Sequence, residues 1–394
     1  MSLSIRPVTT RADLDTFVRL PARLYRDDPR YIPPLVRDRR AFLDPLRSAF
    51  FRHGEAQYFL AERNGRPVGR ISAQIDRAAP KTTFDGIGFY GCLDAEDDAE
   101  VVSELLRTAE AWLGEKGMTT ARGPCLLSMN GEAGLLVEGQ DEPPMLMVPW
   151  HPEYLGPLIE SSSHTKVRDL YYYRIDSHSD HLDRVTKRLG LARRRGALAV
   201  RRLDRRHAAR EMELIRSVYN DAWQHNWGFI PLMPEDLEAF RRDLRLFLEP
   251  DGAIVVECEG EPAGVVLVLP NIAEMTRDLG TDPGTIGWTK LLLRALRKSY
   301  TTARIILFGV NDRFSGSMLG VTVAMTLLDE MVASARRHRL DSVEAGWVLE
   351  NNSALIGIME QFGARRVRTL RLYEHAIERH RRRAGMAANG KPDQ

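Results

Sequence analysis

The sequence predicts a mixed α/β fold built as two related domains in tandem. Three short motifs occur twice, about half a chain apart: Ile5-Arg6 as Val200-Arg201, Gly65-x-Pro67-x-Gly69 as Gly260-x-Pro262-x-Gly264, and Val167-Arg168-x-Leu170-x-x-Tyr173 as Val367-Arg368-x-Leu370-x-x-Tyr373. A repeat of this kind indicates a duplicated structural unit. Within each copy, strand-like and helix-like periods alternate, which favours a central sheet with flanking helices.

The elements follow the same order in both copies. Each copy opens with a short strand and an amphipathic helix, in residues 3–25 of the first and 197–223 of the second. Each continues with two strands around a glycine-containing turn, in residues 57–76 and 253–270. A further strand then precedes a long helix, followed by a strand, a shorter helix and a final strand. We expect a first domain in 1–175, a linker in 176–195, a second domain in 196–378 and a basic disordered tail in 379–394.

Composition sets limits on function. The chain has 394 residues, 43% of them hydrophobic, which is enough for two ordinary cores. A formal charge of +2 gives no global attraction to nucleic acid, and no nucleic-acid partner is expected. Three cysteines without ligand spacing indicate reduced thiols, and the ten histidines show no metal-ligand spacing, so no metal is expected. The N-terminus lacks an apolar signal core, and we expect a cytoplasmic protein.

A candidate anion site lies in the second copy. The apolar strand in residues 305–310 runs into Arg313-x-x-Gly316, and a helix opens at Ser317. Free backbone N–H groups and the positive end of a helix suit a pyrophosphate, and glycine lets the ligand approach closely. A plain glycine-containing turn before an amphipathic helix is the alternative.

The order of elements resembles the GNAT acyltransferase superfamily, whose members move an acyl group from a thioester to an amine. The resemblance implies that Val310, Arg313, Gly316 and Ser317 bind the donor, although Met318 replaces the last small residue of the family's phosphate turn. The residues from Glu350 to Glu374 resemble the closing motif of the superfamily, in which Asn352 would contact the pantetheine arm.

The same resemblance bears on proton transfer. The tyrosine that many members use to protonate the leaving thiolate falls on Met359, so Tyr373 or a water would take that role. Amine attack also needs a general base. Glu350, beside Asn352, is the first candidate, Glu344 on the same predicted strand the second, and Glu257 the third. Positions 344 and 350 are an even number of residues apart, so regular strand alternation would let both side chains face one side.

Candidate acceptor residues lie in both copies. The second copy offers Trp223, His225, Asn226 and Trp227 after its first helix, where tryptophans around polar groups suit an amphipathic ligand. The first copy offers Arg122, Asn130 and Glu132. A tryptophan core anchor, a local turn at Asn130 and a strand-end cap at Arg122 are the structural alternatives.

The first copy departs further from the family pattern. Asp94, Glu96, Asp97, Asp98 and Glu100 crowd the helix start that would have held phosphate, and acidic groups there repel an anion. We therefore expect this copy to have a structural role or to recognise the acceptor.

Nearly the full chain resembles a bacterial tandem-GNAT branch, through strings such as YRDDPRYIPPL, ARGPCLLSMNGEAGLLVEG and YNDAWQHNWGFIPL. Some members of this branch are linked to ceramide synthesis. The resemblance implies an N-acyltransferase with acyl-CoA or acyl carrier protein as donor, no permanently bound cofactor, and a sphingoid base as a candidate acceptor. A catalytically silent tandem GNAT protein that binds a ligand or partner is the alternative.

One segment of the second copy has no counterpart in the first. Within residues 271–300, apolar side chains recur at helical spacing and basic side chains line another face of the same helix. Residues 286–298 are thus compatible with peripheral contact with an anionic membrane on its inner face. Packing of the apolar stripe on the chain's own domain is the alternative.

Overall fold

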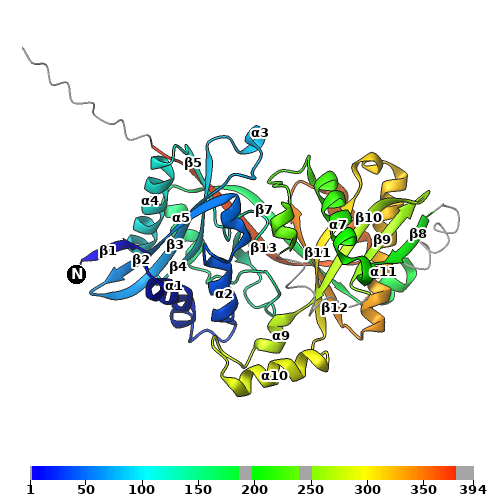
Figure 1. The fold of residues 1–394 in the computed structure, drawn as a ribbon, viewed down its shortest axis with the longest axis horizontal. Coiled ribbons are helices and arrows are strands. Elements are labelled where there is room, and N and C mark those ends of the chain that lie inside the picture. The colour runs from blue at the N-terminus through cyan, green and yellow to red at the C-terminus, as the bar shows by residue number, and fades with distance from the viewer. Residues whose placement is uncertain (1, 186–197, 239–250, 379–394) are drawn as a thin grey trace, which may run out of the picture.

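The computed structural model describes residues 2–185, 198–238 and 251–378, and its strands form one mixed sheet that crosses both halves of the chain (Figure 1). The first half contributes the strands β1 (Leu3–Pro7), β2 (Gly54–Arg63), β3 (Arg66–Asp76), β4 (Ile87–Ala95), β5 (Thr120–Gly123), β6 (Leu135–Glu138) and β7 (Thr165–Asp176). Its helices are α1 (Arg11–Leu24), α2 (Val36–Leu43), α3 (Lys81–Phe84), α4 (Ala99–Glu115) and α5 (Leu155–Ser161), with a 3-10 turn at Ala49–Arg52.

The second half repeats this plan. Its described strands are β8 (Leu198–Arg202), β9 (Ala253–Cys258), β10 (Glu261–Pro270), β11 (Thr302–Val310), β12 (Ser342–Leu349) and β13 (Arg365–Ala376). Its described helices are α7 (Ala208–Trp223), α9 (Ile272–Thr276), α10 (Thr285–Leu296), α11 (Met318–Arg337) and α12 (Ser353–Gln361), with 3-10 turns at Arg205–His207 and Asp312–Phe314. The expected mixed α/β fold with two related halves is confirmed.

The repeated glycine motif has a local cause. Gly65 and Gly260 each follow a residue that also has a positive φ, so that φ is 54° and 75° at Asn64 and Gly65, and 54° and 84° at Glu259 and Gly260. Two successive residues with positive φ make the tight turn whose twist matches a β-hairpin, and glycine adopts this conformation without strain. The turns join β2 to β3 and β9 to β10, which pair antiparallel.

The last strand of each half is exchanged between the halves. The sheet order is β1-β2-β3-β4-β5-β13-β7-β12-β11-β10-β9-β8, and β6 also pairs with β13. The last described strand, β13, therefore lies beside β5 of the first half, with Tyr373 opposite Gly123. In return, β7 lies beside β12 of the second half. Figure 1 shows the orange-to-red β13 crossing from the second half into the cyan elements of the first.

The hydrophobic cores follow the exchange. Tyr173 and Ile175 of β7 pack in the core of the second half, with Val256, Val323 and Met359. Tyr373 of β13 packs in the core of the first half, whose other members come from residues 59–159. Each half thus buries a tyrosine that the sequence assigns to the other half.

The predicted domain boundaries remain a prediction. Because β13 pairs with the first half and β7 with the second, no single position in the sequence separates the two halves of the structure. Strand β7 ends at Asp176 and β8 begins at Leu198, on either side of the predicted linker. Residues 186–195 of that linker and the predicted tail at 379–394 lie outside the described residues. Cys92, Cys125 and Cys258 are free thiols.

Within the described ranges, α11 is long and apolar enough to cross a membrane by length and composition. Its side chains Val323, Leu327, Leu328 and Met331 are at most 1% exposed in the core of the second half. This burial is what a core helix shows, and length and composition alone are weak evidence for a membrane span.

Candidate functional site

The candidate site begins where β11 and β12 stop pairing. These parallel strands are hydrogen-bonded from Thr302 to Ile305 on β11 and from Ser342 to Ala345 on β12, and β11 then runs on to Val310. The register of β12 against β7 shifts between Ala345 and Val348. The carboxyl ends of β11 and β12 are therefore not paired with each other.

Trp223, at the end of α7, links these two strands beyond the point where they pair. Its Nε1–H donates to the carbonyl oxygen of Phe308 on β11 at 2.8 Å. Its ring meets that of Trp347 on β12 edge-on, with 5.4 Å between centroids and 84° between planes. The ring of Tyr219, one turn earlier on α7, stacks on the Trp223 ring with 5.8 Å between centroids. The result is an aromatic cluster at the carboxyl ends of β11 and β12.

The predicted phosphate turn follows β11 directly. Val310 ends the strand, Gly316 has a φ of +68°, and the Ser317 hydroxyl caps α11 by accepting from Gly320 N–H at 3.0 Å. The Arg313 guanidinium lies over the Phe314 ring, 4.5 Å from its centroid. Val310, Arg313, Gly316 and Ser317 therefore lie on one strand-to-helix turn, and Met318 is 81% exposed at the helix start.

In the first half, the equivalent helix start carries acidic side chains. Asp98 caps α4 and accepts from the N–H groups of Glu100 at 3.0 Å and Val101 at 3.4 Å. Arg63 forms ion pairs with Asp98 at 2.7 Å and Glu100 at 2.9 Å. The start of α4 thus carries an anionic cap and a second carboxylate, which repel a phosphate, whereas α11 is capped by a neutral hydroxyl.

Glu350 and Asn352 lie just beyond β12. The Glu350 carboxylate accepts from Lys166 Nζ at 2.7 Å and is 3.9 Å from the Arg168 guanidinium. Asn352 caps α12, and its side-chain oxygen accepts from Leu355 N–H at 3.1 Å. Glu350 is therefore half-buried between two cations of β7, at the same end of the sheet as the aromatic cluster.

Glu344 lies in a different environment. It is 1% exposed, forms a buried ion pair with Arg368 of β13, and lies 3.7 Å from Arg174 of β7. The expectation that Glu344 and Glu350 share one face relied on regular alternation, which the irregularity between Ala345 and Val348 interrupts. Glu344 thus joins three strands at the centre of the sheet. Glu257, the third candidate base, pairs with Arg201 at 2.6 Å.

Tyr373 lies apart from the second-half site. Its side chain is fully buried in the core of the first half, and its hydroxyl donates to Glu160 at 3.1 Å. Burial raises the pKa of Tyr373 well above its usual range. Tyr373 lies there because of the strand exchange: β13 is the last strand of the second half in the sequence but packs in the first half of the structure.

Residues of both halves meet at Trp227. The guanidinium groups of Arg122 and Arg168 lie 5.0 and 5.1 Å from the Trp227 ring centroid. Arg122 also forms an ion pair with Glu374 at 2.9 Å. Because Arg168 lies near both Trp227 and Glu350, it connects the candidate acceptor tryptophan with the first candidate base.

The other candidate acceptor residues are partly drawn into the same region. Asn130 donates to the carbonyl oxygen of Ile230 at 3.0 Å and accepts from the Tyr219 hydroxyl at 3.2 Å. The backbone N–H of Asn226 donates to Trp223 at 2.8 Å. His225 is exposed and 3.6 Å from Asp312 on the phosphate turn. Glu132 instead pairs with Arg39 of α2 at 2.8 Å.

Three residues of this region, Tyr219, Trp347 and Arg168, were not among the predicted site residues. Tyr219 lies in the segment YNDAW, Trp347 in the segment VEAGWVLEN, and Arg168 in the repeated Val-Arg motif. Their types alone gave no reason to separate them from core or surface residues. Their roles follow from contacts across the two halves.

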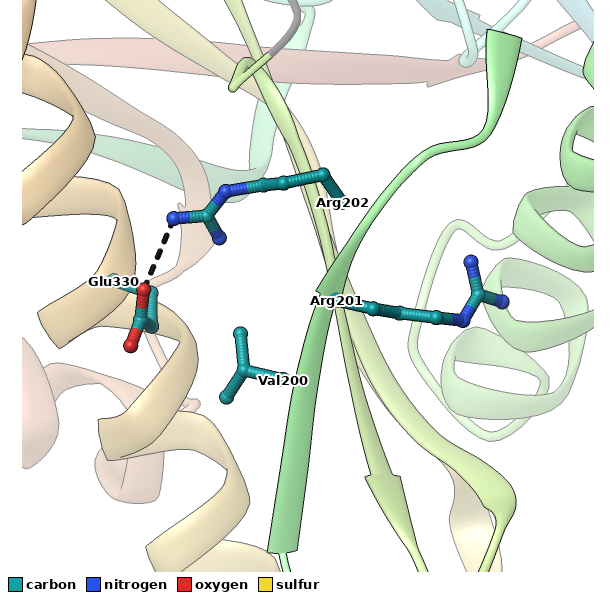
Figure 2. Close-up of a pocket in the computed structure, with 4 residues that line it drawn as sticks. All are labelled: Val200, Arg201, Arg202 and Glu330. Atoms are coloured by element: carbon teal, nitrogen blue, oxygen red, sulfur yellow. Dashed lines mark hydrogen bonds and ion pairs between the residues drawn. The ribbon is translucent and has the colours of Figure 1, made fainter. Parts of the chain in front are cut away.

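A surface pocket elsewhere has a different character (Figure 2). It is lined by Val200, Arg201 and Arg202 of β8 and by Glu330 of α11, and Arg202 pairs with Glu330 at 3.0 Å. Figure 2 shows Arg201 pointing to the opposite side of β8. This pocket lies on the edge strand, several strands away from the carboxyl ends of β11 and β12.

Solved structures define the class of fold. A tandem GNAT protein from the clavulanic acid biosynthesis pathway is similar over 96% of this chain and 99% of its own, with a TM-score of 0.55 and 13% identity. A GCN5-related N-acetyltransferase from Sphaerobacter thermophilus is similar over 95% and 96%, with a TM-score of 0.52 and 11% identity. The fold is that of the tandem GNAT proteins.

Sequence relatives narrow the assignment. No family model matches the chain. The bacterial ceramide synthase of Caulobacter vibrioides is 39% identical over 376 residues, which are 95% of this chain and 98% of that protein. Protein YghO of Escherichia coli is 33% identical over 95% of each chain. The chain therefore belongs to the tandem-GNAT acyltransferase family that includes the bacterial ceramide synthase, and it is an acyltransferase.

Proposed function

We propose that the chain transfers a long acyl group from a thioester, acyl-CoA or acyl carrier protein, to the amine of a sphingoid base, giving a ceramide-type amide. The identity with the Caulobacter ceramide synthase over nearly both full lengths supports this acceptor class. The reaction would take place at the carboxyl ends of β11 and β12, in the second half.

One observation carries the proposal. The turn that follows β11, the aromatic cluster of Trp223 and Trp347, and the carboxylate of Glu350 all lie at the unpaired ends of two neighbouring strands. In open α/β sheets, ligands bind beyond the carboxyl ends of strands. The equivalent helix start of the first half is capped by the Asp98 carboxylate, which repels an anion, whereas the cap of α11 is the neutral Ser317 hydroxyl.

The donor would bind at the turn formed by residues 311–317. Its phosphates would face the N-terminus of α11 and the side chain of Arg313, since helix starts and guanidinium groups favour anions. Gly316 has no side chain to block this approach, and apart from its chain neighbours no heavy atom of the described residues lies within 4 Å of the position of an added Cβ. Asn352 at the start of α12 would receive the pantetheine arm.

In the reaction, the amine nitrogen attacks the thioester carbonyl, the C–N bond forms and the C–S bond breaks. The ammonium proton must leave before attack, and Glu350 would accept it. Lys166 is 39% exposed in its side chain, so the substrate cation can replace it beside this carboxylate. The thiolate is a good leaving group, and a water would carry to it the second proton that the attacking nitrogen loses as the amide forms, because Tyr373 lies in the other half's core.

The acceptor would lie along the aromatic side chains between the halves. Trp223, Trp227 and Trp347 offer apolar area, and Asn130 and Arg168 offer polar groups next to it. An amphipathic amine matches this combination, because its chain can contact the rings while its head group reaches Glu350. The first half would therefore contribute to acceptor recognition.

The test is a coupled comparison of donors and acceptors. Purified protein is incubated with palmitoyl-CoA or palmitoyl-acyl carrier protein, with and without sphinganine, and both thiol release and amide formation are measured by mass spectrometry. We expect amide only when both substrates are present, and much less with Glu350→Gln. Glu360→Gln, an exposed carboxylate on α12, is the matched control. Normal turnover by Glu350→Gln would exclude Glu350 as the base.

We propose further that α10 rests on an anionic membrane and delivers the acceptor. Its Leu291 and Ala295 pack on the second-half core, whereas Ile286, Leu292, Leu293 and Leu296 are 76%, 60%, 45% and 72% exposed. Lys290 and Arg297 are exposed on the same helix. An exposed apolar stripe beside cationic side chains fits the interface of an anionic bilayer.

Vesicle sedimentation tests this surface. We expect the protein to bind vesicles that contain phosphatidylglycerol, less at high salt, and much less after Leu292→Ser with Leu296→Ser. Lys290→Glu should also weaken binding to these vesicles. Arg107→Glu makes the same change of charge on the exposed side of α4 in the first half and is its control. Equal binding of neutral and anionic vesicles, or no loss in the α10 variants, would contradict the membrane contact.

A further inference from the structure

Three ionisable side chains outside the acyl-transfer site come together where the exchanged strand meets the first half. They are Glu110 of α4, His164 just before β7, and His375 of β13. Their donor atoms all lie within 4.8 Å of one another. The three residues come from segments far apart in the sequence, and the acyl-transfer mechanism uses none of them.

The distances within this Glu110–His164–His375 cluster suit a common ligand. Oε1 of Glu110 is 3.2 Å from Nε2 of His164 and 3.0 Å from Nδ1 of His375. In a tetrahedral site with bonds of about 2.0–2.1 Å, neighbouring donor atoms are roughly 3.3 Å apart. Two of the separations are thus within a few tenths of an ångström of the edge of a zinc coordination tetrahedron.

The orientation of His164 provides a second, independent observation. Its side chain is 1% exposed, and its Nδ1 lies 3.2 Å from the carbonyl oxygen of Ser162, so Nδ1 carries the proton and donates it to this acceptor. The other ring nitrogen, Nε2, then presents a lone pair. Among the described residues it has no hydrogen-bond partner, although Glu110 Oε1 lies 3.2 Å away.

A buried lone pair that faces a carboxylate oxygen calls for a cation between the two. Metal-bound histidines commonly donate their second ring N–H to a backbone carbonyl, which fixes the tautomer, and His164 has this arrangement with Ser162. Two imidazoles and one carboxylate are a typical ligand set for zinc and similar divalent transition metals. His375 is 28% exposed in its side chain, which leaves a path for the ion and a water as fourth ligand.

We propose that Glu110, His164 and His375 form a binding site for a divalent transition-metal ion, zinc by ligand type, which fastens the C-terminal strand to the first half. Glu110 belongs to a helix of the first half, and His375 to the strand that the second half donates. A metal bound to both resists withdrawal of β13, and its binding energy adds to the stability of the folded chain.

The test uses the untagged full chain after treatment with a chelator. Zinc is titrated by calorimetry, and cobalt is titrated while its visible absorption is recorded. We expect one equivalent of either ion, a cobalt spectrum of the intensity that four-coordinate sites give, and an increase in Tm of several degrees with zinc. His375→Gln, at a half-buried position, should weaken binding at least 100-fold, and His207→Gln, an exposed histidine outside the cluster, should not.

Two results would overturn the proposal. One is the absence of stoichiometric binding by the wild-type chain, which would mean that Glu110 and the histidines share protons only. The other is unchanged binding by both His375→Gln and Glu110→Gln. Because the first result needs only the wild-type protein, a variant that fails to fold does not decide the outcome.

Discussion

Replacement of Glu344 by glutamine separates a structural carboxylate from a catalytic one. Glu344 is 1% exposed and its main partner Arg368 is 3% exposed, so the two charges are buried against each other. Glutamine keeps the shape but leaves Arg368 without its counter-charge. Breaking a buried ion pair in this way typically costs 3–5 kcal/mol, and we take about 3 kcal/mol because the amide oxygen still accepts one hydrogen bond.

This cost converts into a measurable shift. With an unfolding entropy of roughly 2 cal/mol/K per residue, a cooperative chain of 394 residues loses about 1 °C of Tm for every 0.8 kcal/mol. Glu344→Gln should therefore lower the Tm by roughly 4 °C. Glu350 is half-buried just beyond the end of β12, and ion pairs near the surface contribute little to stability. Glu350→Gln should therefore change the Tm by about 1 °C or less while it lowers amide formation.

The assay is differential scanning fluorimetry or calorimetry on both variants, together with the amide-forming reaction below the transition. Glu360→Gln, at an exposed position on α12, controls for the loss of one carboxylate. A Glu344→Gln protein with unchanged Tm would refute the assignment of Glu344 to the core. A Glu344→Gln protein that is fully folded but inactive would restore it as a candidate base.

Three further predictions use single substitutions. Trp223→Phe removes the indole N–H that holds β11 and should cost about 1–2 kcal/mol in unfolding free energy by denaturant titration, together with activity. Gly316→Ala should cost about 1 kcal/mol, since its φ is positive, and should raise the KM for the thioester more than it lowers kcat. His53 lies between Asp76 and Asp236, which raise its pKa to about 10. The protonated form therefore stabilises the fold fully below pH 6.5, and this contribution declines towards pH 10; His53→Gln should flatten that part of a Tm-against-pH curve.

Much of the fold could be predicted because the determinants are local. The type of turn at Gly65 and Gly260 follows from two adjacent residues, and the start of α11 at Ser317 follows from its hydroxyl cap. The position of Arg313 and Gly316 on one turn follows from the strand before them and the helix after them. Such features depend on a few consecutive residues, which the sequence presents directly.

The strand exchange could not be predicted for a physical reason. The strands β7 and β13 carry the same Val-Arg-x-Leu-x-x-Tyr motif, so either one offers the same side chains to either core. Tyr173 and Tyr373 are accordingly both buried, each in the other half's core. The local sequence pattern predicts that a strand forms at each of these two segments. The position that each strand takes in the sheet depends on the chain connection between the halves.

The site was predicted in part. The structure brings Trp223, Trp227, Arg122 and Asn130 to one region. They were candidates because of their residue types, the two tryptophans after the first helix of the second copy and the other two in the first copy. The parity argument for Glu344 and Glu350 failed because a register shift in β12 has no clear sequence signal. The Glu110–His164–His375 cluster could not be predicted from the sequence either. Its three residues are far apart in the chain and form no motif, and only the strand exchange brings them together.

The position of β13 between β5 and β7 has a consequence for the origin of the molecule. Two separate chains that exchange their last strands form a symmetric swapped dimer, in which every subunit must keep its own ligand site. Once the two are fused in one polypeptide, the halves can change independently while each still receives its missing strand from the other. The acidic cap at Asp98 in one half and the open turn at Gly316 in the other are the kind of divergence that such a fusion permits. Neither half should fold when it is expressed alone.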